Sequence, residues 1–134
     1  MVRYLFDTNV ISDYLSESFG GEELQLLENI IDQVPNMSII TKIELLCWRH
    51  DSRVEKIIRN FAKDSEVINI NDKIVELCVQ IRKNKKIKTP DAIIAATAIA
   101  TNSVLLTNNE KDFHGIKRLK VLNPHKLRKT KAKT

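Results

Sequence analysis

The chain has 134 residues, the length of one domain with a full hydrophobic core. Hydrophobic residues make up 43% and charged residues 29%, as in soluble globular proteins, and no apolar run approaches the roughly 20 residues that span a bilayer. Residues 1–81 hold 8 Lys/Arg against 14 Asp/Glu, a net of −6, whereas residues 82–134 hold 14 against 3, a net of +11. Such a basic half indicates a polyanionic partner such as nucleic acid, although solubility and a disordered tail explain it equally well.

The first residues and the cysteines indicate a cytoplasmic protein with no membrane segment. Asp7 interrupts the first apolar stretch, so no secretion signal is predicted. Cys47 and Cys78 fall in apolar helical patterns and lack metal-ligand spacing. Both are therefore predicted to be buried free thiols in a reducing compartment.

Short apolar strands alternate with helical patterns along the chain. The predicted strands are Tyr4–Phe6, Met37–Ile40, Val67–Ile70, Val104–Leu106 and a weak last strand, Val121–Leu122. The predicted helices are Val10–Leu15 with Thr8 or Asn9 as cap, Glu22–Val34, Thr41 to about Arg49, Val54–Lys63, Asp72–Lys83, and an alanine-rich helix from a Thr89 cap to Ala100. This alternation predicts an α/β fold with a parallel sheet of about five strands flanked by helices. Residues 1–124 are expected to form one domain, and the Lys-rich residues 125–134 a flexible tail.

Four acidic residues fall where predicted strands end or helices begin. They are Asp7 after the first strand, Glu44 in the turn after the second, Asp91 at the start of the alanine-rich helix and Asp112 after the fourth strand. The functional crevice of a parallel sheet lies outside the carboxyl ends of its strands, so Asp7, Glu44 and Asp112 are expected at one edge. Asp91 reaches that edge only if the connection 82–88 returns the chain to it.

Each of these acids also has a purely structural interpretation. Thr41-x-x-Glu44 fits a capping box, Asp91 suits the first turn of a helix, Asp7 fits an Asx-turn, and Asp112 fits a surface acid. Capping does not require the four to occur together, however, so the set indicates shared chemistry. Crowded carboxylates need a counter-charge, and oxygen ligands without His or Cys favour Mg²⁺ or Mn²⁺. Such an ion activates water toward a phosphodiester, which is nuclease or phosphatase chemistry.

Uncharged and basic residues beside these acids complete the predicted site. The side chains expected to hydrogen-bond the acids are those of Asn9, Thr107, Asn108 and Asn109. The side chains predicted to grip RNA phosphates are Arg82, Lys83, Lys85, Lys86 and Lys88. For any one of these lysines a solvated loop is an equally good interpretation. The histidines, His50, His114 and His125, show no ligand spacing and are predicted to be surface residues.

Four stretches together resemble the PIN-domain family and, within it, the VapC-like toxins of bacterial toxin–antitoxin pairs. They are LFDTNVIS at Leu5–Ser12, ITKIELLCW at Ile40–Trp48, PDAIIAATAI at Pro90–Ile99 and LLTNNEKDF at Leu105–Phe113. In this order they cover nearly the whole chain. The resemblance implies a three-layer α/β/α fold with a five-stranded parallel sheet. It also implies a Mg²⁺-dependent endoribonuclease that forms a homodimer and is inhibited by a small cognate antitoxin.

The resemblance further implies that Asp7, Glu44 and Asp91 are metal-binding acids. Some relatives place a fourth acid at the position of Asn109 and others at that of Asp112, so Asp112 is the expected fourth ligand, with Glu110 as a rival. The predicted function is a toxin that cuts phosphodiester bonds in single-stranded RNA. The alternative is a non-catalytic RNA-binding module whose acids are only caps. A small-molecule phosphatase is disfavoured because the chain has no Asp-x-Asp pair.

Overall fold

Five parallel strands form the centre of the molecule in the computed structural model, which describes residues 2–16 and 20–126. The strands are β1 (Arg3–Phe6), β2 (Asn36–Ser38), β3 (Glu66–Ile68), β4 (Ser103–Leu106) and β5 (Lys120–Leu122). They lie side by side in the order β3-β2-β1-β4-β5, and every neighbouring pair is parallel. The predicted parallel sheet is therefore confirmed, and all five strands end at the same edge.

The two central strands are apolar on both faces because both faces are covered. Neighbouring residues of a strand point to opposite sides of the sheet. In β1, Leu5 packs into one core cluster and Phe6 into the other. In β4, Leu105 and Leu106 pair with them in register and repeat this division, and all four side chains are fully buried. Continuous apolar runs are what strands buried on both faces require.

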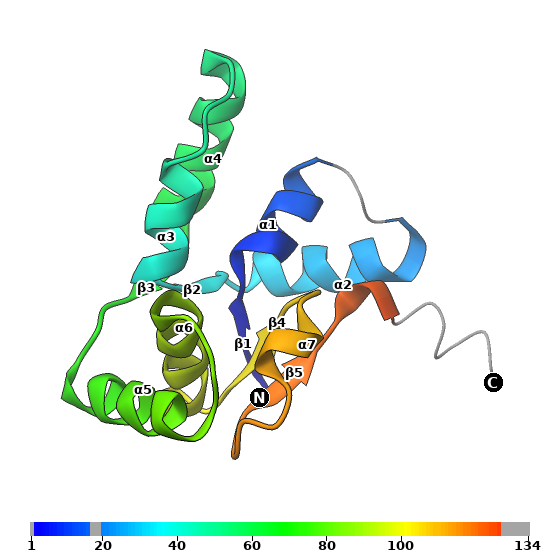
Figure 1. Ribbon diagram of the computed structural model, residues 1–134. Helices are drawn as coiled ribbons and strands as arrows, with labels where there is room; N and C mark the ends of the chain where they lie inside the picture. The colour runs from blue at the N-terminus through cyan, green and yellow to red at the C-terminus, as the bar shows by residue number, and fades with distance from the viewer. Residues whose placement is uncertain (1, 17–19, 127–134) are drawn as a thin grey trace.

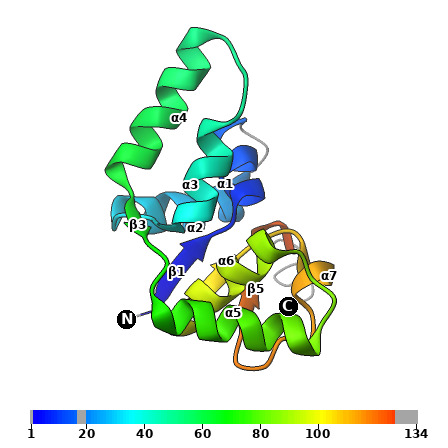
Figure 2. The ribbon, with the colours of Figure 1, turned by 60° about the vertical axis from the view of Figure 1, so that its left-hand side comes forward.

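Helices form the outer two layers of the fold. Their bounds are α1 (Thr8–Leu15), α2 (Gly21–Asp32), α3 (Ile39–Leu46), α4 (Ser52–Asp64), α5 (Asp72–Asn84), α6 (Thr89–Ala100) and α7 (Glu110–Phe113), with a 3-10 turn at Pro124–Lys126. Helices α5 and α6 supply the core on one face of the sheet, and α1 to α4 supply the core on the other. Figures 1 and 2 show α3 and α4 as a hairpin that projects away from the sheet. The three-layer α/β/α arrangement is thus confirmed.

Helix α6 is built of small side chains that let it lie close against the sheet and α5. Ala92, Ala95 and Ala96 are fully buried, and alanine also has the highest helix propensity. Proline fits its first turn because the N–H groups there have no partner within the helix. The N-cap is Lys88 without a side-chain hydrogen bond, so the cap predicted at Thr89 is wrong by one residue.

Other predicted boundaries fail where a strand turns directly into a helix. The predicted strand Met37–Ile40 ends at Ser38, whose hydroxyl accepts a hydrogen bond from the N–H of Ile40 at 3.1 Å and caps α3. Similarly, Asp7 caps α1, so the caps predicted at Thr8 or Asn9 are wrong. The strand predicted at Val67–Ile70 ends at Ile68, and the short helix α7 has no counterpart in the predicted elements.

The C-terminal boundary and the cysteines also differ in part from expectation. The predicted tail includes His125 and Lys126, yet both lie in the 3-10 turn, and Lys126 forms an ion pair with Glu110. Residues 127–134 of the predicted tail lie outside the described residues. Cys78 is buried as predicted, whereas Cys47 is exposed at the end of α3, so that prediction is wrong. Across residues 2–16 and 20–126, no helix is long and apolar enough to cross a membrane.

Candidate functional site

The carboxylate of Asp7 is the most buried of the four predicted acids. Asp7 follows β1 directly, the residue is only 5% exposed, and its Oδ1 accepts a hydrogen bond from the N–H of Thr8 at 2.8 Å. Its own N–H donates to the carbonyl of Leu106 in β4 at 2.9 Å. The end of the central strand and the start of α1 therefore fix this carboxylate at the carboxyl edge of the sheet.

Two uncharged side chains hold the second oxygen of Asp7. The Thr107 hydroxyl donates to Asp7 Oδ2 at 2.8 Å, and Asn9 Nδ2 donates to the same oxygen at 3.0 Å. Thr107 comes directly after β4, the neighbour of β1, and it is fully buried. A buried carboxylate needs such donors, because an unpaired buried charge is strongly unfavourable.

Glu44 approaches the same edge from α3. Its Oε1 accepts a hydrogen bond from the Thr8 hydroxyl at 2.6 Å, across 36 positions of sequence. The capping-box interpretation of Thr41-x-x-Glu44 is wrong, because Thr41 lies inside α3 and Ser38 caps that helix. Glu44 is therefore free of a capping role and turns toward the Asp7 loop instead.

Asp91 lies in the first turn of α6 and is brought to the other acids by the fold. Burial raises its pKa, and the charges of Asp112 and Glu44 raise it further, whereas Lys88 lowers it. These interactions require Asp91 to lie near Asp112 and Glu44. The connection between α5 and α6 thus returns the chain to the carboxyl edge, as the sequence allowed.

Asp112 and the polar residues after β4 extend the set. Asn109 donates through Nδ2 to Asp112 Oδ2 at 2.8 Å and through its backbone N–H to the Thr107 hydroxyl at 3.0 Å. Asn108 donates through its backbone N–H to Asn9 Oδ1 at 3.1 Å. The four residues expected to hydrogen-bond the acids are therefore joined to one another and to two of the acids.

The rival acid Glu110 belongs to a different contact. A hydrogen bond from Lys126 is the main reason that its pKa lies below the ordinary value. Its charge is not among those that raise the pKa of Asp7 or Asp91. The geometry therefore favours Asp112 over Glu110 as the fourth member of the set.

Mutual repulsion marks these carboxylates as a group. Burial is the main cause that raises the pKa of Asp7; hydrogen bonds from Thr107 and Thr8 oppose it, and the charges of Asp91 and Glu44 raise the pKa again. Like charges that are held together in this way favour a bound cation. We refer to Asp7, Glu44, Asp91 and Asp112 below as the acidic cluster.

The donor set of the acidic cluster suits a hard cation, because it offers only carboxylate oxygens. Neighbouring carboxylates raise the pKa of Asp7 and Asp91, but the four side chains do not form a ready-made ligand shell. Within residues 2–16 and 20–126, no three His, Cys, Asp or Glu side chains are placed to hold a metal ion as they stand. A cation would have to draw the acidic cluster together.

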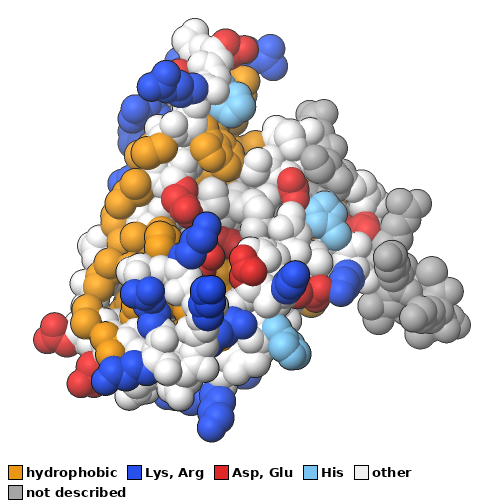
Figure 3. Space-filling view, viewed as in Figure 1, with side chains coloured by type: hydrophobic (Ala, Val, Ile, Leu, Met, Phe, Trp, Pro, Cys, Tyr) orange, Lys and Arg blue, Asp and Glu red, His pale blue; other side chains and the backbone are white. Residues whose placement is uncertain are grey.

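Basic side chains lie next to the acidic cluster on the α5–α6 connection. Figure 3 shows acidic side chains near the middle of this face, with Lys and Arg side chains beside and below them. Arg82 braces the connection by donating from Nε to the carbonyl of Ile87 at 3.1 Å. Lys83, Lys86 and Lys88 are exposed, and Lys85 is half-buried. Of the five predicted RNA-binding residues, Lys88 is the one whose charge acts on Asp91.

The sequence patterns gave no role in the site to three polar side chains that the structure joins to it, those of Thr8, Asp13 and His125. Thr8 orients Glu44 through its hydroxyl. Asp13 Oδ2 accepts a hydrogen bond from Asn108 Nδ2 and lies 2.9 Å from His125 Nε2. His50 and His114 are exposed as predicted, whereas His125 is half-buried by this contact. The D-T-N sequence at Asp7–Asn9 was the available signal for Thr8. Nothing local links Asp13 to His125, which is 112 positions away.

Comparison with known proteins gives a consistent result over most of the chain. A family model for the PIN domain matches residues 4–119. Ribonuclease VapC1 of Methanocaldococcus jannaschii is 29% identical over 124 residues, covering 86% of this chain and 82% of that protein.

Solved structures resemble the chain over a similar span. A toxin–antitoxin complex from Klebsiella pneumoniae contains a chain that is 35% identical, with a TM-score of 0.70 over 90% of this chain and 97% of that one. A chain of the DNA-bound VapBC complex from Salmonella typhimurium has a TM-score of 0.75 at 20% identity, over 92% and 99% of the two chains. At 20% identity, the resemblance to the Salmonella structure is evidence for the fold alone.

Proposed function

This chain belongs to the PIN domain family, and from that premise we propose that it is a divalent-metal-dependent endoribonuclease, the toxin of a toxin–antitoxin pair. The observation that carries the proposal is the acidic cluster at the carboxyl edge of the sheet, in which the charges of carboxylates from separate segments raise the pKa of Asp7 and of Asp91. Such repulsion serves no packing purpose, whereas it prepares a cation site.

We expect the acidic cluster to hold Mg²⁺ or Mn²⁺. When bound, such an ion polarises a phosphodiester and lowers the pKa of water, which is the chemistry that RNA hydrolysis needs. The chain's own groups have distinct roles. Thr107 and Asn9 hold the Asp7 carboxylate in place, Thr8 orients Glu44, and Asn109 orients Asp112. The Thr107 hydrogen bond also opposes the rise in the pKa of Asp7, because it stabilises the charged form of that carboxylate.

RNA is the substrate that the charges and the relatives support. The connection with Arg82, Lys83, Lys85, Lys86 and Lys88 leads to Asp91, and these cations would contact phosphates on either side of the cleaved bond. The name of the archaeal relative supports ribonuclease activity, and the Klebsiella complex supports a cognate antitoxin as partner. A cytoplasmic location follows from these partners.

Exposed apolar side chains support protein contacts by this chain. Ile43 on α3, Ile57 on α4, and Val75 and Val79 on α5 are each between 45% and 52% exposed. Exposed apolar side chains that gather on a surface are typical of protein interfaces. We expect these helices to serve the homodimer or the antitoxin complex, and analytical ultracentrifugation of the purified chain would measure the first.

Cleavage of single-stranded RNA in the presence of Mn²⁺ tests the proposal. Asp7→Asn and Asp91→Asn are expected to lower the rate by roughly 100-fold or more, with native circular dichroism, because each removes a carboxylate from the cluster. Asp64→Asn is the matched control, because Asp64 is exposed at the end of α4. The proposal fails if the wild-type protein leaves RNA intact, or if Asp7→Asn cleaves it as fast as the wild type.

The alternative is a non-catalytic RNA-binding module, and one observation favours it. No three acidic, His or Cys side chains among the described residues are placed to hold a metal ion. Thermal melting separates the two functions, because an ion at 100 times its Kd stabilises the folded state by about 2.7 kcal/mol. The nuclease requires that Mg²⁺ or Mn²⁺ raise the midpoint in the wild type and not in Asp91→Asn. The RNA-binding module predicts no response in either protein.

A further inference from the structure

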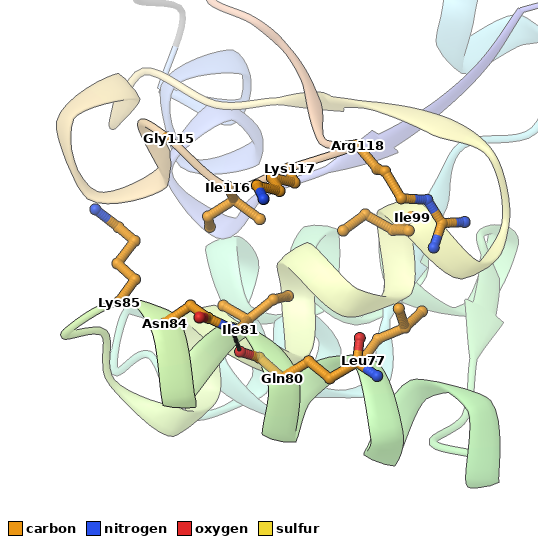
Figure 4. Close-up of a pocket in the computed structure, with 10 residues that line it drawn as sticks. All are labelled: Leu77, Gln80, Ile81, Asn84, Lys85, Ile99, Gly115, Ile116, Lys117 and Arg118. Carbon is orange, nitrogen blue, oxygen red and sulfur yellow. Dashed lines mark hydrogen bonds between the residues drawn. The ribbon is translucent and has the colours of Figure 1, made fainter.

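A cavity of about 450 Å³ lies between α5 and the loop that follows α7. Its apolar walls are formed by Leu77, Ile81, Ile99 and Ile116. Figure 4 shows Ile81 and Ile116 facing one another across the space, with Lys85 at one end and Arg118 at the other. A cavity of this volume falls within the range of sites that take small organic groups.

The charges around this cavity have one sign. Lys85, Lys117 and Arg118 line it, and no acidic residue does. None of the three is in an ion pair with another described residue. A ligand that fits must therefore present an apolar face to the isoleucines and negative charge to the rim. An unstacked nucleobase with its flanking phosphates has this combination, and a guanidinium such as that of Arg118 can also stack on a base.

Both walls of the cavity lie close in sequence to the acidic cluster. Lys85 is three residues before Lys88, whose charge acts on Asp91, and three residues span at most about 11 Å. On the other wall, Gly115 is three residues after Asp112. A single strand of RNA that crosses the acidic cluster can therefore continue into this cavity.

We propose that the cavity is an RNA subsite that takes one unstacked nucleotide beside the cleaved bond. Its base lies between Ile81 and Ile116, and its phosphates contact Lys117 and Lys85. The inference rests on the proposed function, because the ligand is part of the same RNA substrate. It adds a specificity site, since the shape of the cavity would select which base is accepted at that position.

The test is binding of a 5′-fluorescein-labelled, random-sequence single-stranded RNA, measured by fluorescence anisotropy with EDTA present so that no cleavage occurs. Gln80→Trp fills the cavity from α5 without changing charge, because Gln80 lines it and is exposed. Gln25→Trp is the matched control, since Gln25 is exposed on α2 and does not line the cavity. Lys117→Gln removes one cation from the rim, with Lys73→Gln on α5 as its control.

Gln80→Trp is expected to weaken RNA binding at least fivefold without changing its salt dependence, whereas Gln25→Trp binds like the wild type. Lys117→Gln should reduce the slope of log K against log salt by about 0.7, the effect of one lost phosphate contact on a single strand. If Gln80→Trp and Lys117→Gln both bind like their controls, the subsite is overturned while RNA cleavage by the wild type still supports the nuclease.

Two further outcomes would also overturn the subsite. If the wild type neither binds nor cleaves RNA, the proposed function fails together with it. If Gln80→Trp changes the sedimentation of the protein alone and leaves RNA affinity intact, the cavity serves a protein contact instead. Lys117→Gln keeps the test valid if Gln80→Trp does not fold, because Lys117 is exposed in a loop.

Discussion

Replacing Thr107 by valine tests whether the buried Asp7 carboxylate is charged and held by hydrogen bonds. Thr107 is fully buried; its hydroxyl donates to Asp7 Oδ2 at 2.8 Å and accepts from the Asn109 N–H at 3.0 Å. Valine keeps the shape of threonine but can neither donate a hydrogen bond to Asp7 nor accept one from Asn109. A hydrogen bond to a charged group contributes about 1.5–3 kcal/mol, and an orphaned donor adds about 1 kcal/mol. We expect Thr107→Val to lower the free energy of unfolding at neutral pH by about 2–4 kcal/mol.

The loss of stability should depend on pH, because it acts through an ionisable group. Burial raises the pKa of Asp7 above its ordinary value of 3.8, and the Thr107 hydrogen bond opposes that rise. Without the hydroxyl the pKa of folded Asp7 rises further, so the variant holds its proton to higher pH than the wild type. The ionisation part of the loss is complete above both folded pKa values and disappears as the pH falls through them.

Urea unfolding followed by circular dichroism, at about pH 7 and about pH 4, measures both effects. Thr107→Ser is the control that keeps the hydroxyl, and a double-mutant cycle with Asp7→Asn isolates the pair. We expect a coupling energy of about 1–2 kcal/mol at neutral pH. An equal loss at both pH values, together with no coupling to Asp7→Asn, would refute the idea that Thr107 stabilises a charged carboxylate.

Three further substitutions test other parts of the fold. Asp91→Asn should raise the free energy of unfolding at neutral pH, because burial and neighbouring carboxylates raise the pKa of Asp91. This gain in stability is present above the raised folded pKa and is lost as the pH falls toward 3.8, the ordinary value. Urea unfolding that shows no gain at neutral pH would contradict the repulsion. Val34→Gly should stabilise the folded protein by about 1 kcal/mol, because Val34 adopts a φ of 70° just after α2. Val75→Gly inside α5 is the control and should destabilise the protein by a similar amount. The reverse order of the two urea midpoints would contradict this. Ala96→Leu should lower the free energy of unfolding by about 1–3 kcal/mol, because Ala96 is fully buried, and an unchanged melting midpoint would show loose packing of α6.

The sheet and the position of the acids were predictable because both follow from short-range rules. A strand buried on both faces needs a continuous apolar run, and Leu5–Phe6 and Leu105–Leu106 supply one each. A parallel sheet then places whatever follows each strand at a common edge. Asp7 and Thr107 could therefore be assigned to the same place without knowledge of their contacts, and their hydrogen bond bears this out.

The start of α3 could not be read from the sequence because two signals compete there. Ser38 and Thr41 are both good caps, and the run Met37–Ile40 is apolar enough for a strand or a buried helix. The structure resolves the choice through Ser38, which is fully buried and caps the helix. Two more helical residues than expected, Ile39 and Ile40, then precede Glu44. Its partner Thr8 lies 36 positions away, so no local pattern indicates that contact.

The connection between α5 and α6 links the fold to the proposed chemistry. A single helix between two parallel strands starts at their carboxyl edge and ends at the opposite one. Here two helices, α5 and α6, connect β3 to β4, and α6 is the one that leads into β4. The segment Lys85–Lys88 must therefore bring the chain back to the carboxyl edge before α6 begins. This return places Asp91 beside Glu44 and Asp112, puts Lys88 next to Asp91, and makes Lys85 an end of the cavity. One short connection therefore places Asp91 and, in the proposed function, the phosphate contacts and the subsite as well, so a change in its length is expected to impair all three while the two cores remain packed.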